Sequence, residues 1–340
     1  MIMKHLEAFT LGKKFGHPQM NEDSLVIMPD LGYAVIDGVT DRNGTKYDGM
    51  LSGRFASRRV RRAIEMFLIA QGQPGMAELH YRGPVELIAY LDNAIRVGYE
   101  ENGAYERAEA DWKLRGGCTV MLAFHLGDRL EFVAVGDSGA RINEAELFQV
   151  LKPLDDVTSI LRREAWRAFA ARGYAEADCE KLAAALTWHG SRFQAAGSPT
   201  SDAAIIAEIE ARALSACRER LPHVPEWEFF ELFHKGIANG QGDFQNVTDR
   251  ALGYGGLDGF GVPEKYIETR SYALAEVETI ELFSDGYFLP GAEFGVASWE
   301  AAFAYVEERD PNKIGEFLST KGTTATMLTD DRTYLGVRLR

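Results

Sequence analysis

The stretch Tyr33-Ala-Val-Ile-Asp-Gly-Val39 combines a strand signal with an acidic group. Its first four residues are apolar and partly β-branched, as is typical of a buried strand, and Asp37-Gly38 follows directly. A second apolar run at 25–28 precedes it, and residues 29–32 (Pro-Asp-Leu-Gly) are typical of a hairpin turn. The stretch therefore predicts an antiparallel hairpin with a carboxylate at the end of its second strand.

Blocks of helix and strand patterns surround this hairpin. Helices are predicted over residues 52–70 and 85–112, where apolar residues recur at helical spacing. The later predicted elements are strands at 118–126, 130–135, 266–274, 277–284, 323–329 and 334–339, and helices at 298–309 and 311–319. Adjacent hairpins with paired helices indicate antiparallel sheets covered by helices, and the βαβ alternation of a parallel sheet is missing. The predicted fold class is α+β.

The composition of the chain changes near residue 155, after which alanine, glutamate, arginine and tryptophan dominate and strand signals almost vanish. The predicted helices of this region are 157–172, 176–188, 201–220 and 226–238. We therefore predict a helical insertion at 155–245 between the two parts, 1–154 and 246–340, of an α+β domain. Its aromatic residues form a small core in the simplest interpretation, and a lid or docking surface is the alternative. The glycine-rich run 253–261 lacks the lysine and helix context of a P-loop and is predicted to be a connector.

The charge balance limits the classes of partner. The chain has 37 basic and 51 acidic residues, a formal net charge of −14, which argues against nucleic acid or an anionic membrane as the main partner. Arginines cluster between Arg54 and Arg62, and a solvated helix face is the simplest interpretation of that cluster. No segment approaches the ~20 apolar residues of a membrane span, and the three cysteines lie far apart, so a reduced, cytoplasmic protein is expected.

Acidic residues gather in five short clusters that lie far apart in the sequence. The clusters are Asn-Glu-Asp-Ser at 21–24, Ile-Asp-Gly at 36–38, Gly-Asp-Ser at 136–138, Ser-Asp-Gly at 284–286 and Asp-Asp-Arg-Thr at 330–333. Four of them adjoin apolar runs of strand type, so strand ends could deliver their carboxylates to one place. Divalent cations such as Mg²⁺ and Mn²⁺ bind oxygen ligands, and a pair of them needs several converging carboxylates. Taken singly, each cluster is also compatible with a turn that merely ends a strand.

Eight short segments, in order and context, resemble the metal-dependent protein phosphatases of type 2C, the PPM family, in their bacterial form. The segments are 20–24, 33–39, 52–57, 117–120, 133–138, 247–253, 281–286 and 330–333. The resemblance covers most of the chain outside the insertion. It implies a sandwich of two antiparallel β-sheets flanked by helices, with a metal centre in a cleft at one end. It also places the helical insertion where family members carry a variable flap.

The resemblance implies a role for each acidic cluster in binding two or three Mn²⁺ or Mg²⁺ ions. The implied metal-binding positions are Glu22, Asp23, Asp37, Gly38 through its carbonyl oxygen, Asp137, Asp285 and Asp330. Asp37, Asp285 and Asp330 would be the catalytic ones, and Asp137 would serve the third ion. The implied reaction is hydrolysis of phosphoserine and phosphothreonine on proteins by a metal-activated water, without a side-chain nucleophile. The substrate would be a phosphorylated protein docked by the insertion at 155–245.

The chain departs from the family pattern where the substrate should be held. Pro18 stands at the usual position of a phosphate-binding arginine. The nearby basic residues that could replace it are Lys13, Lys14 and His17. The other departures are Val39-Thr40-Asp41 in a normally glycine-rich run, Gly139 in place of an arginine and Asp331 in place of an asparagine. Two alternatives therefore stay open: a non-catalytic metal-binding regulatory module of the same fold, and a phosphatase that acts on a small-molecule phosphoester.

Overall fold

The computed structural model describes residues 3–41 and 43–339, and these residues form two compact units. The first unit comprises residues up to 151, residues 255–304 and the chain from 330 onward, and the second comprises 152–254 and 305–329. Each unit has a buried apolar core of its own. None of the helices in the described residues combines the length and the apolar character that a membrane span needs.

Within the described residues, two five-stranded sheets form the framework of the first unit. The strand order of one sheet is β1 (His5–Leu11), β12 (Arg332–Arg338), β11 (Thr279–Phe283), β8 (Gly139–Ile142) and β9 (Glu146–Gln149). The order of the other is β10 (Glu268–Ala273), β7 (Arg129–Val135), β6 (Val120–Leu126), β3 (Gly32–Ile36) and β2 (Ser24–Met28), and a separate hairpin contains β4 (Lys46–Tyr47) and β5 (Met50–Leu51). Neighbouring strands are antiparallel, which confirms the predicted α+β fold of two antiparallel sheets flanked by helices.

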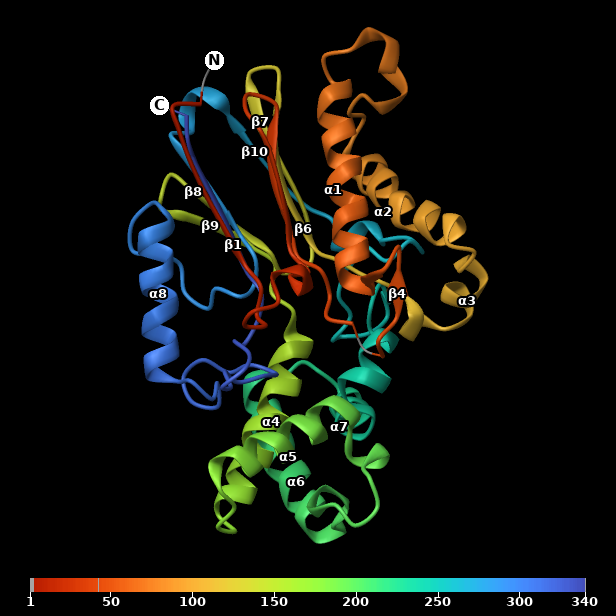
Figure 1. Ribbon diagram of the computed structural model, residues 1–340, viewed down its shortest axis with the longest axis vertical. Helices are drawn as coiled ribbons and strands as arrows, with labels where there is room; N and C mark the ends of the chain where they lie inside the picture. The colour runs from red at the N-terminus through yellow and green to blue at the C-terminus, as the bar shows by residue number, and fades with distance from the viewer. Residues whose placement is uncertain (1–2, 42, 340) are drawn as a thin grey trace. The chain divides into compact units, whose positions relative to one another are not determined.

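Strand β3 shows how the sheets are covered. Val35 lies in the core between the two sheets, whereas its neighbour Ile36 lies in a second core shared with helices, because successive side chains of a strand point to opposite faces. The flanking helices are α1 (Ser52–Ala70), α2 (Pro84–Glu101) and α8 (Val296–Arg309). Figure 1 shows α1 and α2 along the sheet of β6 and β7, and α8 along the sheet of β8 and β9. Trp299 of α8 packs against Phe283 of β11 in a third core.

The antiparallel register brings the acidic clusters together. Ser24 at the start of β2 pairs with Ile36 at the end of β3, so the acidic cluster before β2 adjoins the one after β3. Phe283 at the end of β11 pairs with Tyr334 of β12 on one side and with Gly139 of β8 on the other. The clusters before β12 and before β8 therefore adjoin the one after β11. Antiparallel pairing thus places the end of one strand beside the start of the next, at the same end of the sheet.

The second unit is helical. Its α-helices are α4 (Pro153–Ala170), α5 (Glu176–His189), α6 (Ala203–Arg220) and α7 (Glu226–Gly240). Phe169 and Phe229 are fully buried in its core, as the interpretation of a small aromatic core requires. Trp227 instead is 51% exposed, and the Arg250 guanidinium carbon lies 4.5 Å from its ring centre.

Arg162 of α4 joins residues 305–329 to this helical unit. Its side chain is fully buried and donates hydrogen bonds to the carbonyl oxygens of Asn312 (2.8 Å), Lys313 (3.3 Å) and Ser319 (3.3 Å). A buried guanidinium needs such partners, because an unpaired buried charge is costly. The division into a sandwich at 1–154 and 246–340 and an insertion at 155–245 stays a prediction.

Two of the predicted elements are wrong, and a third is interrupted. Residues 311–319 form turns rather than a helix, and residues 323–329 do not form a strand. Asp310 explains why residues 311–319 do not form a helix. Its carboxylate accepts hydrogen bonds from three backbone N–H groups that would otherwise bond to carbonyl oxygens within a helix. The predicted helix at 85–112 is divided into α2, which ends at Glu101, and the short helix α3 (Tyr105–Ala110). Gly103 lies between them, and its φ of 59° is in the left-handed region that ends a helix.

A buried carboxylate organises the glycine-rich connector. Asp92 of α2 accepts backbone hydrogen bonds from Asp258 (2.9 Å), Gly259 (2.8 Å) and Gly261 (2.8 Å). The N–H groups that would cradle a phosphate in a P-loop thus bind an internal carboxylate, which favours the predicted connector. Arg115 adds a positive charge, with its Nη1 atom 3.2 Å from Asp258 Oδ2.

The Asp258→Asn substitution is expected to weaken the pH dependence of stability. Burial, and then the charge of Asp92, raises the pKa of Asp258 to about 6. The pKa of an unfolded Asp is about 3.9. At pH values between about 3.9 and about 6, the folded state therefore keeps a proton that the unfolded state loses. Stability therefore falls as the pH rises through this window, and the loss is complete above the folded pKa. Asparagine keeps the oxygen that accepts the Phe260 N–H but does not titrate.

Between pH 5 and 7, the free energy of unfolding of Asp258→Asn should therefore fall by about 1 kcal/mol less than that of the wild type. Urea unfolding at several pH values in this range measures the difference. Asp128→Asn is the matched control, because Asp128 lies exposed in the turn between β6 and β7. Equal pH slopes for the wild type and Asp258→Asn would contradict the prediction.

Candidate functional site

Asp37 and Asp285 form the centre of the acidic group. Each follows the end of a strand, and their half-buried carboxyl groups lie within electrostatic reach of one another. Burial is the main cause that raises the pKa of both residues, and their carboxylate neighbours raise it further. Two carboxylates held this close repel each other, so the pair is costly to the fold unless a cation offsets its charge.

The glycine that follows each of these aspartates allows another acidic cluster to approach closely. A Cβ atom on Gly38 would lie 2.6 Å from the carbonyl oxygen of Glu22, and one on Gly286 would lie 2.1 Å from that of Asp331. Any side chain at either position would therefore push the neighbouring cluster away. The Asp-Gly pairs predict the strand ends and also explain why the clusters before β2 and β12 can lie so near.

Asp23 lies beside this pair and is buried. Its Oδ2 atom accepts a hydrogen bond of 2.7 Å from the hydroxyl of Thr333, whereas no partner is found for its buried Oδ1 atom among the described residues. Burial, followed by the charges of Asp331 and Asp285, raises the pKa of Asp23. A buried carboxylate oxygen without a donor is costly to the fold and is the kind of atom that a cation would satisfy.

Asp137 and Asp330 complete the group around Asp37. Both are half-buried, and both raise the pKa of Asp37 and of Asp285 by their charge, which places them within electrostatic reach of the central pair. The structure thus brings together the predicted residues Asp23, Asp37, Asp137, Asp285 and Asp330. Their metal-binding roles stay predictions.

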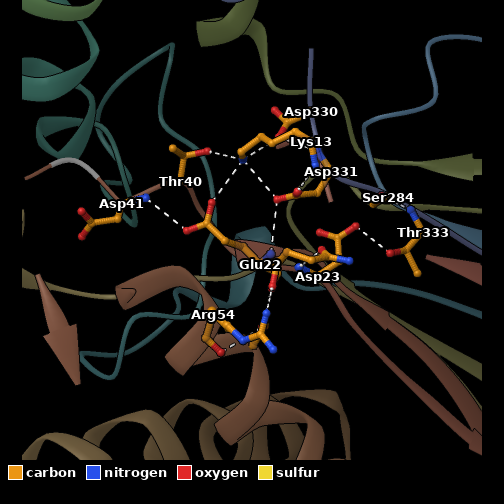
Figure 2. Close-up of polar contacts among 12 residues, drawn as sticks. Lys13, Glu22, Asp23, Thr40, Asp41, Arg54, Ser284, Asp330, Asp331 and Thr333 are labelled. Atoms are coloured by element: carbon orange, nitrogen blue, oxygen red, sulfur yellow. Dashed lines mark hydrogen bonds and ion pairs between the residues drawn. The ribbon is translucent and has the colours of Figure 1, made fainter. Parts of the chain in front are cut away.

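Glu22 lies in the same neighbourhood but binds a positive charge from the chain itself. The ammonium of Lys13 lies 3.1 Å from Glu22 Oε2, 2.9 Å from Asp330 Oδ1 and 3.1 Å from Asp331 Oδ2. It also donates a hydrogen bond of 2.9 Å to the hydroxyl of Thr40. Figure 2 shows these side chains converging on the Lys13 nitrogen from three separate segments of the chain.

The Lys13 side chain is 6% exposed, so its charge is held inside the protein. Burial lowers the pKa of Lys13, but the charges of Asp330, Asp331 and Glu22 outweigh it and hold the pKa well above its usual range. Lys13 is therefore charged at neutral pH, and its ammonium is committed to carboxylates. Of the three basic residues that could replace the arginine usual at the position of Pro18, Lys13 thus has a charge that is already paired.

Arg54 belongs to the arginine cluster for which the sequence predicts only a solvated helix face. Its Nη1 atom donates hydrogen bonds to the carbonyl oxygens of Asn21 (2.8 Å), Gln19 and Pro18 (3.4 Å). Arg54 thus fixes the turn that contains Pro18 and leads into Glu22.

Gly139, which stands where the family usually has an arginine, has a physical reason of its own. A Cβ atom at this position would lie 2.3 Å from the ring of Phe283.

The chemical type of the donors suits a divalent cation on one side of the acidic group only. Among the residues that the structure describes, no group of three or more His, Cys, Asp or Glu side chains is arranged so that it could hold a metal ion. At Glu22 and Asp330, carboxylate oxygens already bind the Lys13 ammonium. Beside Asp37 and Asp285 lies the buried Asp23 oxygen that has no partner among the described residues. That side has the ligand type that Mg²⁺ and Mn²⁺ prefer.

No protein-family model matches this chain, and no curated protein matches it. Among solved structures, it is similar to the serine/threonine phosphatase Stp1 from Staphylococcus aureus, with a TM-score of 0.46 and 13% identity over 100% of this chain and 97% of that chain. It is similar to the Mycobacterium tuberculosis serine/threonine phosphatase PstP/Ppp, with a TM-score of 0.41 and 17% identity over 99% of this chain and 98% of that one. It is also similar to a PstP catalytic domain in complex with 2 manganese ions, with a TM-score of 0.43 and 16% identity over 98% of this chain and 97% of that chain. Along nearly its whole length, the chain is similar to solved bacterial serine/threonine phosphatases.

Proposed function

We propose that this protein is a metal-dependent phosphatase that hydrolyses phosphoserine and phosphothreonine on proteins. The observation that carries the proposal is the meeting of Asp37 and Asp285, which come from distant strand ends, with Asp23, Asp137 and Asp330 within electrostatic reach. The order of the acidic motifs, which resembles that of type 2C phosphatases, supports the same reaction. Buried carboxylates that raise the pKa of one another destabilise a fold, so a catalytic role explains their presence better than a structural one.

The chain's own residues would bind and orient the reacting groups. Asp37 and Asp285 would supply oxygen ligands to Mn²⁺ or Mg²⁺, with Asp23 and Asp137 beside them. A divalent cation in this position lowers the pKa of water and offsets negative charge on a phosphoryl group. The Thr333 hydroxyl fixes the Asp23 carboxylate. The predicted ligand roles of Glu22, Asp330 and the Gly38 carbonyl, and the binding of two or three ions, belong to the same proposal.

The helical unit is the proposed docking element for a phosphorylated protein. It exposes large aromatic side chains, with Phe193 at 57% and Trp227 at 51% exposed. Aromatic residues are enriched at protein interfaces, and binding energy from parts of the substrate away from the phosphate can speed turnover. A phosphoprotein would therefore be a better substrate than a small phosphoester.

A non-catalytic regulatory module is the second candidate. The pairing of Lys13 with Glu22 and Asp330 favours it, because two of the predicted metal ligands are engaged by a protein cation. In that case the fold would bind a metal ion without turning over a substrate. The two candidates make different predictions for the same sample.

Phosphate release by the purified full-length chain tests the proposal. The substrates are p-nitrophenyl phosphate and a panel of phosphoserine and phosphothreonine peptides, with and without Mn²⁺ after treatment with a chelator. We expect turnover only with the metal, and kcat/KM at least about 10-fold higher for the best peptide than for p-nitrophenyl phosphate. Mn²⁺ binding in calorimetry without turnover of any substrate would instead support the regulatory module.

A further inference from the structure

The Lys13 ammonium lies where the predicted ligand set would place a metal cation. It contacts Glu22 and Asp330, which come from two different acidic clusters, at 3.1 and 2.9 Å. Both of these carboxylates are in the ligand set that the sequence predicts. An ammonium at this point supplies the positive charge that would otherwise have to come from an ion.

The surroundings of Lys13 hold the ammonium in place. Its backbone N–H donates to Asp331 Oδ1 at 2.7 Å, while its side chain reaches Oδ2 of the same carboxylate at 3.1 Å. Gly12 lets the chain before Lys13 lie close to Asn21, the residue before Glu22, because a Cβ atom on Gly12 would lie only 3.0 Å from the Cβ atom of Asn21. Asp331 is 2% exposed, so a third carboxylate, itself buried, faces the single ammonium. Backbone and side chain are thus fixed by the same partner, unlike a lysine that rests loosely on the surface.

We propose that the Lys13 ammonium takes the place of one divalent cation in this centre, so that the chain binds one metal ion fewer than its acidic motifs imply. Divalent cations would be confined to the side of Asp37 and Asp285, where the buried Asp23 oxygen has no partner among the described residues. A divalent ion at Glu22 would lie close to an ammonium that is shielded from water, and like charges at short distance in a protein interior repel strongly. The inference rests on the proposed metal-dependent function, but it is measured by counting ions and not by turnover.

Counting bound Mn²⁺ in the wild type and in Lys13→Met tests the inference. Methionine has a similar length and no charge, so it frees the carboxylates of Glu22, Asp330 and Asp331 for a metal ion. The free Mn²⁺ concentration is read from the electron paramagnetic resonance signal of the aqueous ion during a titration of the full-length chain. We expect Lys13→Met to bind one Mn²⁺ per chain more than the wild type, and the charge-preserving Lys13→Arg to bind as many as the wild type.

Glu22→Gln in the otherwise wild-type chain is the second measurement, which remains informative if Lys13→Met does not fold. Because Glu22 binds the ammonium and not a metal ion, we expect the number of bound Mn²⁺ ions to stay the same and their affinity to change by less than about 10-fold, in the lower part of the range of coupling between separate sites. A loss of one ion, or a more than 10-fold weaker affinity, would overturn the inference. Equal ion counts in the wild type and a folded Lys13→Met would overturn it too, while leaving the proposed function intact. If neither protein bound Mn²⁺, the proposed function would fail and the inference with it.

Discussion

The Asp37→Asn and Asp285→Asn variants are expected to lose Mn²⁺-dependent phosphate release, with kcat/KM lowered by at least about 10³-fold. Asparagine has the size of aspartate and keeps one oxygen, but it carries no negative charge to bind a divalent cation or to balance it. Initial rates over a range of Mn²⁺ concentrations measure the loss. They also separate weaker metal binding, which excess Mn²⁺ would restore, from a lost contribution to the reaction, which it would not.

The same two substitutions are expected to stabilise the fold, which separates lost function from unfolding. Burial first, and then neighbouring carboxylates, raises the pKa of Asp37 and of Asp285, so both residues destabilise the folded state at neutral pH. Asparagine removes that cost, and the free energy of unfolding without metal should rise by about 1 kcal/mol. Asp128→Asn in the exposed turn is the matched control and should change neither quantity. Full turnover in either variant would contradict the catalytic assignment, and reduced stability would contradict the electrostatic argument.

The acidic residues could be predicted from the sequence because each has a local signal. Asp37 and Asp285 follow apolar, β-branched runs and precede glycine, a pattern that marks a strand end in any context. The meeting of the clusters then follows from antiparallel pairing, which places the end of one strand beside the start of the next. The long helix α1 was likewise predicted with its observed limits, because its apolar residues keep helical spacing over many turns.

Lys13 could not be predicted as a buried cation, because its partners are defined only by the folded chain. Asp330 and Asp331 lie more than three hundred residues away, and the sequence near Lys13 gives only a positive charge. Strand β1, which leads to it, also lacks a clear pattern: it lies at the edge of its sheet, and its side chains are exposed or half-buried throughout. Strands β8 and β9 span four residues each, too few for a two-residue period to be recognised.

A second buried charge supports the strand that leads to Asp285. Glu281 of β11 is fully buried, and its carboxylate accepts hydrogen bonds from Arg141 Nε (2.6 Å), Trp299 Nε1 (2.8 Å) and the Tyr334 hydroxyl (2.7 Å). These donors belong to β8, α8 and β12, so one carboxylate links β11 to both neighbouring strands and to the helix that covers them. Arg141 is itself buried and donates further to two backbone carbonyl oxygens.

The Glu281→Leu variant is expected to lower the free energy of unfolding by about 3–5 kcal/mol, because it leaves the Arg141 charge buried without its partner. Tyr334→Phe removes only one of the three donors and should cost about 1 kcal/mol. Adding Arg141→Met to Glu281→Leu should recover part of the loss, since a buried ion pair replaced as a whole by apolar side chains often costs little. Urea unfolding of the four proteins gives these differences.

The free energy of unfolding that Arg141→Met recovers shows why Glu281→Leu is destabilised. If the double variant is more stable than Glu281→Leu alone, the loss came from the stranded guanidinium and not from poor packing of leucine. A Glu281→Leu variant that loses less than about 1 kcal/mol would show that Arg141 is satisfied without the carboxylate. Because Glu281 lies on β11 and Asp285 follows the end of that strand, the double variant also tests whether this end of β11 keeps its position without the buried ion pair. Mn²⁺-dependent turnover close to that of the wild type would mean that backbone pairing with β8 and β12 is enough to hold Asp285 beside Asp37.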